Sequence, residues 1–183
     1  MIGMKQSSTH KERNPYATTQ DFCRVFHQNL DSLYVLALLL TGDQSDAEKC
    51  FVAGFADSVI TNRVFKEWAY AWAKIAIIKN AVSKVHPRLD SSSPASIREV
   101  DSELPDASNI ELHAVLALPG FIRFVFVLSV LEQFTERDSA RLLGCSIKEL
   151  RRSRVRGLEL IANSDVHDQS PEPISQIVPG VDR

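Results

Sequence analysis

The sequence predicts an all-α protein. Apolar residues recur every three or four positions over much of the chain, which is the spacing that gives an α-helix one buried side. Only 7 glycines among 183 residues, and 8% aromatic residues, also favour helices over a β-sandwich. Helix-capping residues stand at the ends of several of these periodic segments. We expect two small helical domains joined by an acidic flexible linker.

The N-terminal domain is predicted over residues 19–86. Its first helix should begin at Asp21 and continue to Leu40 along one apolar side. A second helix should begin at Ser45, because Ser45 and Glu48 have the spacing of a capping box.

A third helix is predicted over about 64–86, ending before Pro87, which cannot continue a helix. Trp68 and Trp72 are four residues apart, so both should point to the same side and fill the core. Tyr70 points away from them and is expected to be the exposed aromatic residue.

The remaining segments differ in composition. Residues 1–18 and 163–183 are polar and are expected to be disordered. Segment 87–109 contains three prolines, a run of serines and many acids, which predicts a flexible acidic linker. The C-terminal domain is predicted over 110–162, with a short helix, then an apolar helix over 120–133, then a helix pair.

This helix pair has the clearest local signals in the chain. Thr135 and Asp138 can cap a short helix, and Gly144 can end it because glycine tolerates the left-handed conformation. Ser146 can cap the next helix, where it forms a capping box with Glu149. Two capped helices around a three-residue break predict a helix-turn-helix.

The second helix of the pair is basic, which suits the major groove of DNA. Its predicted buried side consists of Ile147, Leu150, Leu158 and Ile161, with Arg154 partly buried. The predicted DNA-binding residues are Ser146, Lys148, Glu149 and Arg152, near the helix N-terminus where base edges are reached, and Arg151 and Arg156 for phosphates. For any one of these residues, a solvated face without DNA contact is the alternative.

No motif indicates a catalytic, metal or cofactor site, so we expect a protein that is not an enzyme. Cys23, Cys50 and Cys145 are far apart, and none has a histidine at metal-binding spacing. The N-terminus lacks the apolar core of a signal peptide. The longest apolar run, at 33–40, is far shorter than the ~20 residues that span a bilayer. A cytoplasmic location without membrane contact is expected.

Several short motifs carry a family resemblance. In the C-terminal half they are Leu118-Pro119, Arg123, Val125-Phe126-Val127-Leu128, Leu131-Glu132, Ala140, Leu142-Leu143-Gly144, Ser146, Leu150, Arg151 and Arg156. In the N-terminal half they are Leu33-Tyr34, Leu36-Ala37, Leu40-Thr41-Gly42-Asp43, Asp46-Ala47-Glu48 and Phe55. On these residues the chain resembles the extracytoplasmic-function (ECF) sigma factors of bacterial RNA polymerase, over roughly residues 20–162.

The resemblance implies a protein that binds the RNA polymerase core and directs it to promoter DNA. The N-terminal domain would bind the polymerase clamp, with Asp46 and Glu48 as predicted contacts. Tyr70, Lys74 and Lys79 are the residues predicted to assist promoter melting. The helix-turn-helix would bind the upstream promoter element, and an anti-sigma factor is a further partner compatible with the family.

Four positions depart from the family pattern. Val52 and Ala53 stand where the family has a Gln-Glu pair that meets the clamp, and Ser139 and Arg154 stand where apolar residues are expected. Two alternatives therefore remain open. One is a DNA-binding regulator that does not bind polymerase, and the other is a sigma-like protein-interaction module whose basic helix does not touch DNA.

Overall fold

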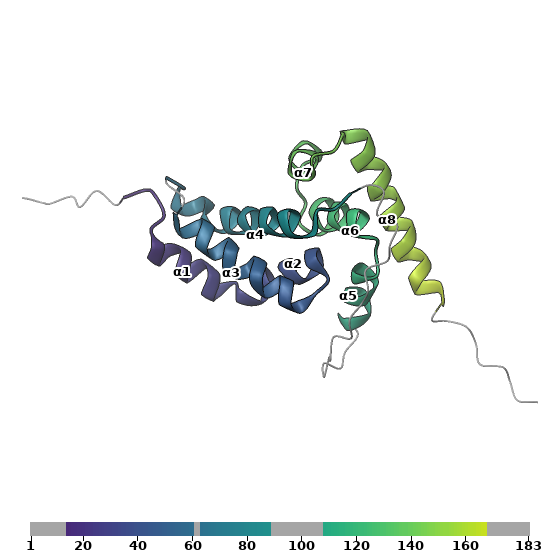
Figure 1. The fold of residues 1–183 in the computed structure, drawn as a ribbon, viewed down its shortest axis with the longest axis horizontal. Coiled ribbons are helices and arrows are strands. Elements are labelled where there is room, and N and C mark those ends of the chain that lie inside the picture. Colours follow the sequence, from purple (N-terminus) through teal and green to yellow (C-terminus); the bar gives the residue numbers. More distant parts are fainter. Residues whose placement is uncertain (1–13, 61–62, 89–107, 168–183) are drawn as a thin grey trace, which may run out of the picture. The chain divides into compact units, whose positions relative to one another are not determined.

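The computed structural model of this protein describes residues 14–60, 63–88 and 108–167. Within these residues the chain is helical, with one isolated antiparallel β-bridge between Tyr16 and Phe65 (Figure 1). The predicted all-α class is confirmed for this part of the chain. Most of the predicted linker and of the two predicted disordered ends lies outside the described residues.

The chain divides into two compact units, the first of which is Met1–His86. Its described helices are α1 (Thr19–Gln28), α2 (Leu30–Thr41), α3 (Gln44–Ile60), the 3-10 turn η1 (Lys66–Trp68) and α4 (Ala69–Val85). α3 packs along α4, and α2 packs against both (Figure 1). The largest fully buried apolar side chains of this unit are Phe22, Leu33, Leu36, Leu40, Ile77 and Ile78.

The single helix predicted from Asp21 to Leu40 is divided at Asn29 in the structure. Asn29 has φ −122° and ψ 28°, outside the helical region, and its side-chain amide donates to the carbonyl of Val25 at 2.7 Å. A short amide side chain that bonds a local carbonyl offers the backbone an alternative to the helix. The periodic apolar pattern continues across this break, so the pattern alone does not reveal it.

The capping box predicted for Ser45 and Glu48 is wrong. The side chain of Asp43 accepts a hydrogen bond from the backbone N–H of Asp46 at 2.9 Å, so the helix begins one residue before Ser45. Gly42 ends α2 in the left-handed conformation and leaves only Asp43 between the two helices. Because the connection is that short, Asp43 takes the capping position.

The core position predicted for Trp68 is also wrong. Residues 66–68 form a 3-10 turn before α4, and Trp68 is 58% exposed. Its place in the core is taken by Ala69, which is buried with Phe22 and Val64. Trp72 packs against this cluster as a partly buried residue, and Tyr70 is exposed as predicted.

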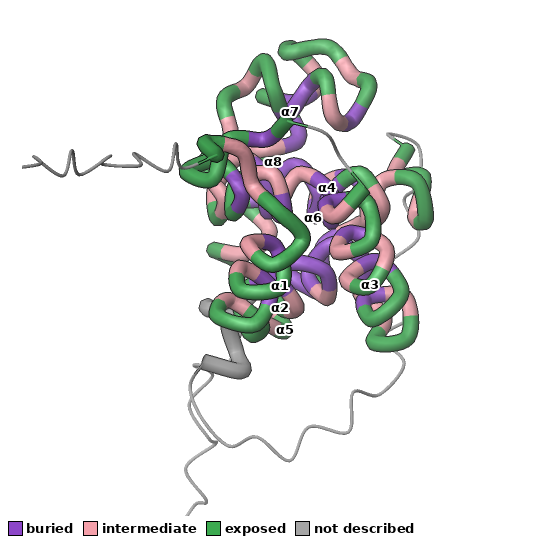
Figure 2. Tube along the Cα trace, turned by 90° about the vertical axis from the view of Figure 1, so that its left-hand side faces the viewer, coloured by how far each residue is buried: buried purple, intermediate pink, exposed green. Residues whose placement is uncertain are grey.

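The second unit, Pro87–Arg183, contains a further group of helices. They are α5 (Ser108–Leu116), α6 (Gly120–Phe126), the π-helical turn η2 (Val127–Leu131), α7 (Glu136–Leu143) and α8 (Ile147–His167). α8 packs mainly against α6, and α7 packs against α8. Buried and exposed stretches alternate along the helices, as expected for helices that bury one side (Figure 2).

Two helix ends in this unit differ from the sequence prediction. The helix predicted over 120–133 ends in a π turn, in which the N–H of Glu132 bonds the carbonyl of Val127 at 2.9 Å. Gln133 then adopts a positive φ of 54°, which directs the chain towards α7. α8 continues to His167, past the predicted domain boundary at residue 162. No helix in the described ranges has the length and apolar character needed to cross a membrane.

Candidate nucleic-acid interface

Local capping positions the two helices of the pair α7–α8. The Thr135 hydroxyl oxygen accepts from the N–H of Asp138 at 3.1 Å, and Gly144 ends α7 with φ 64°. At the start of α8, the N–H and hydroxyl of Ser146 donate to one oxygen of Glu149 at 2.8 and 2.7 Å, and the N–H of Glu149 donates to the Ser146 hydroxyl oxygen at 3.2 Å. The predicted caps of the two helices are confirmed.

The buried side of α8 differs from the one predicted. Leu150, Ser153 and Gly157 face inward, whereas Ile147 and Leu158 are 40% and 47% exposed. A Cβ on Gly157 would lie 3.2 Å from a methyl of Ile122 on α6. The missing side chain permits this close approach, so the small residues face α6 and the larger apolar residues turn outward. The prediction that Ile147 and Leu158 are buried is wrong, whereas Leu150 is buried as predicted and Ile161 is partly buried.

The two unusual residues of the pair are both accommodated. Ser139 is 0% exposed, and its hydroxyl has no hydrogen-bond partner among the described residues. Arg154 is partly buried, as predicted, and one guanidinium nitrogen lies 3.4 Å from a carboxylate oxygen of Glu136. The helix pair therefore forms with polar groups at positions where apolar residues are expected.

Three acids near the turn of the helix pair, Asp138, Glu149 and Glu136, have partners within the pair. Asp138 accepts from the Thr135 hydroxyl at 2.7 Å. The backbone N–H and then the hydroxyl of Ser146 lower the pKa of Glu149. Hydrogen bonds from Arg151 lower the pKa of Glu136. Glu136 and Glu149 are therefore ionised at neutral pH and have donors close by.

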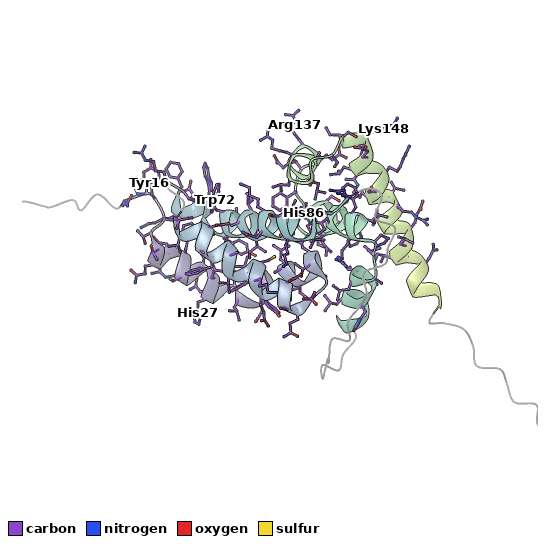
Figure 3. All side chains as sticks on the ribbon, viewed as in Figure 1. Tyr16, His27, Trp72, His86, Arg137 and Lys148 are labelled. Carbon is purple, nitrogen blue, oxygen red and sulfur yellow. The ribbon has the colours of Figure 1, made fainter. Side chains whose placement is uncertain are left out.

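Four cations of the pair remain exposed without a hydrogen bond or ion pair to any residue that the structure describes. They are Lys148 and Arg152 on α8, and Arg137 and Arg141 on α7. Each pair has four-residue spacing and so shares one side of its helix. Figure 3 shows Arg137 and Lys148 near the end of the unit where α7 meets α8. Arg137 and Arg141 were not predicted as site residues, although their spacing on a capped helix was the available signal.

The other predicted DNA-binding residues have intramolecular partners. Arg151 bonds Glu136, and Arg156 lies 3.2 Å from Glu159 on the same helix. Glu149 and Ser146 complete the capping box described above. The prediction that these four side chains contact DNA is not tested by these contacts.

The predicted clamp contacts lie on α3. Burial raises the pKa of Asp46, but hydrogen bonds from Lys49 and Lys84 outweigh it and the pKa is lowered. The Lys84 ammonium lies 3.3 Å from Asp46 and so joins α4 to the start of α3. Glu48 is exposed and accepts from the Gln44 amide at 3.3 Å. The same helix presents Val52, which is 63% exposed, and Ala53, which is partly buried.

The three residues predicted to assist promoter melting lie on α4, where the two lysines contact different aromatic rings. The Lys74 ammonium lies 5.1 Å from the centre of the Tyr70 ring, and the Lys79 ammonium 5.5 Å from that of Trp72. Trp72 and Lys79 help to line a pocket of about 230 Å³, together with Asp57, Ile60, Ile75 and Ala76. The three predicted residues therefore do not form one cluster.

A second aromatic group lies at the connection between α3 and α4. The Phe65 ring is 5.0 Å from the Tyr16 ring and 5.3 Å from that of Trp68. The backbone of Tyr16 is held there because the N–H of Ala17 donates to Val64 and that of Lys66 to Pro15. The sequence prediction missed this group because Tyr16 is far from Phe65 in sequence, and a contact of that kind leaves no periodic signal.

The cysteines do not form a shared site in the described structure. Cys23 is exposed, Cys50 is buried and Cys145 is partly buried, and all three are free thiols. Burial raises the pKa of the Cys50 and Cys145 thiols. Among the residues in the described ranges, no group of three or more potential metal ligands comes together.

The comparisons with known proteins do not indicate a family for this chain. No model of a known protein family matches this sequence, and no curated protein matches it significantly.

Proposed function

We propose that this chain is a sigma-factor-like transcription initiation protein, which binds the RNA polymerase core and directs it to promoter DNA through α7–α8. The observation that carries the proposal is the charge arrangement of the helix pair. Lys148, Arg152, Arg137 and Arg141 are exposed without ion-pair partners among the described residues, while the nearby acids are compensated. Exposed cations near the N-terminus of a capped helix are well placed to bind the phosphates and the major groove of DNA.

In this proposal the N-terminal part of α8 enters the major groove. Lys148 and Arg152 would contact base edges, since they lie in the first two turns of the helix. Arg137 and Arg141 would contact phosphates on the flanking backbone and thereby fix the orientation of the helix pair.

The first unit supplies the other half of the proposed function. Asp46 and Glu48 would contact the polymerase clamp from α3. Tyr70, Lys74 and Lys79 would assist promoter melting from α4, and the exposed Trp68 in the preceding 3-10 turn adds an aromatic surface on which a base could stack.

Reconstitution with core polymerase tests the proposal directly. We expect the chain to co-purify with core enzyme and to produce a promoter-specific transcript in a run-off assay. If it does neither with a panel of genomic promoter fragments, the sigma-factor proposal is wrong.

The DNA contacts are tested separately with a duplex selected from random sequence by the chain. Arg152→Ala should cost about 1–3 kcal/mol and relax specificity at one position, as for a base contact. Arg137→Ala should weaken binding to all sequences and lower the salt slope by about 0.9, as for a phosphate contact. Equal effects of both variants on every sequence would contradict this division of roles.

A second candidate function is a DNA-binding regulator that does not bind polymerase. Val52 and Ala53 favour it, because an exposed valine replaces a polar residue of the pair that meets the clamp in ECF sigma factors. DNA binding without capture of core enzyme would support this candidate. Failure of both assays would instead favour a protein-interaction module.

A further inference from the structure

One carboxylate binds two arginines of α8. Glu136, the first residue of α7, accepts from Nε of Arg151 at 2.9 and 3.1 Å and from Nη2 at 2.7 Å. A guanidinium nitrogen of Arg154 lies 3.4 Å from Oε1 of the same Glu136 carboxylate. Arg151 is 15 residues from Glu136 in sequence, so the cluster depends on how α7 packs on α8.

A bound phosphate would have to compete with Glu136 for these donors. A phosphate binds arginine through the same fork of N–H groups that a carboxylate uses. The Arg151 side chain is 63% exposed, so solvent reaches it, but its Nε and one Nη point to Glu136. Glu136 stays ionised at neutral pH, because the Arg151 hydrogen bonds hold its pKa below the usual range.

We propose that Glu136 is a specificity-determining residue, which limits phosphate contacts by holding Arg151 and Arg154 in an intramolecular cluster. This inference rests on the proposed function, in that α7–α8 binds DNA. Affinity that is independent of sequence grows with the number of phosphates neutralised, whereas base contacts distinguish one site from another. Withholding two arginines therefore lowers binding to all DNA and leaves discrimination to Lys148 and Arg152, which have no hydrogen bond or ion pair within 4 Å among the described residues.

The first test is Glu136→Gln, which removes the charge and keeps the shape of the side chain. Binding of the full chain to a fluorescent mixed-sequence DNA duplex is measured by anisotropy over a range of salt concentrations. The variant should bind more tightly, with a salt slope steeper by about 0.9 for each arginine released. For one arginine, its advantage over the wild type should grow about 3.5-fold when salt falls from about 200 to about 50 mM.

The second test separates release of Arg151 from a general change in charge. Arg151→Ala should leave the salt slope of the wild-type chain unchanged, and should remove the gain when combined with Glu136→Gln. A slope lower by about 0.9 in the single variant would show that Arg151 already contacts phosphate, and would overturn the inference. Glu67→Gln, an equal charge change on the exposed turn before α4, serves as the control. An equal gain in that control would also overturn the inference.

The outcomes distinguish the two proposals. If the wild-type chain does not bind the duplex even at low salt, DNA binding by α7–α8 and the inference both fail. If it binds, and Glu136→Gln has the wild-type slope, only the inference fails. Circular dichroism checks that the helices persist, and if Glu136→Gln unfolds, the slope of Arg151→Ala in the wild-type chain decides.

Discussion

At the scale of single residues, Gly54 determines how closely α3 and α4 approach. A Cβ at this position would lie 2.7 Å from a side-chain carbon of Ile77 and 3.0 Å from its backbone nitrogen. The Ser58 hydroxyl donates to the Gly54 carbonyl at 2.7 Å and is fully buried. The contact with Ile77 includes its backbone, so a side-chain rotation alone cannot relieve it.

We therefore expect Gly54→Ala to lower the free energy of unfolding by about 1–3 kcal/mol, as overpacking does. Urea unfolding followed by tryptophan fluorescence measures it, because both tryptophans lie in the first unit. Gly120→Ala, in the second unit, is the control, since nothing lies within 4 Å of a Cβ there, and its unfolding is followed by circular dichroism. Equal losses in the two variants would contradict the steric explanation.

Ser139 is a second residue whose effect can be measured alone. Its buried hydroxyl has no hydrogen-bond partner among the described residues, and an unsatisfied buried polar group costs free energy. Ser139→Ala should raise the stability of the second unit by about 1 kcal/mol. Thermal melting followed by circular dichroism measures the change. Ser58→Ala should instead destabilise the first unit, because the Ser58 hydroxyl is bonded.

At the scale of elements, the turn between α7 and α8 depends on the conformation of Gly144. Its φ of 64° lies in the left-handed region, and its N–H bonds the carbonyl of Ala140. The next N–H, of Cys145, bonds the same carbonyl at 3.0 Å. The turn therefore satisfies the end of α7 through a backbone shape that side chains with a Cβ resist.

Gly144→Ala should cost about 1–2 kcal/mol of stability, because a Cβ is unfavourable in the left-handed conformation. No atom lies within 4 Å of that Cβ, so the cost comes from the backbone and not from a clash. Gly144→Asn should cost less, since asparagine tolerates this conformation. Comparison of the two melting temperatures checks the prediction, and an Asn variant as unstable as the Ala variant would refute it.

At the scale of the whole molecule, four carboxyl groups share one response to pH. Hydrogen bonds from Thr18 lower the pKa of Asp21, and the pKa values of Asp46, Glu136 and Glu149 are lowered as described above. A carboxyl with a lowered folded pKa contributes stability that is present above its unfolded pKa. This stability is lost as pH falls through the folded pKa.

We expect the free energy of unfolding to change little between neutral pH and about pH 5, and to fall below about pH 4. Urea unfolding at a series of pH values measures this dependence. Asp21→Asn should reduce the acid sensitivity of the first unit, because asparagine has no carboxylate that is protonated as the pH falls. A stability that rises on acidification would contradict the assigned directions.

The accuracy of the sequence predictions depended on how local each interaction is. The capping of α7 and α8 involves residues within a few positions of one another, so Thr135, Gly144 and Ser146 could be assigned from spacing. The break at Asn29 was missed because an amide bond to a carbonyl leaves the apolar period intact. Trp68 was placed in the core by helical spacing, but the 3-10 turn before Ala69 changes the direction of its side chain.

The sequence by itself determined the all-α class and the caps of the helix pair, because these follow from composition and from contacts within a few residues. Only the tertiary structure decided which side of α8 is buried, since Gly157 lets α6 approach where the larger apolar residues would not. It also decided which cations form an ion pair between the two helices. Arg151 and Arg154 bond Glu136 across two helices, whereas Lys148 and Arg152, on the same helix, have no such partner among the described residues. Partner choice among like charges depends on distances between helices, and helix periodicity does not encode those distances.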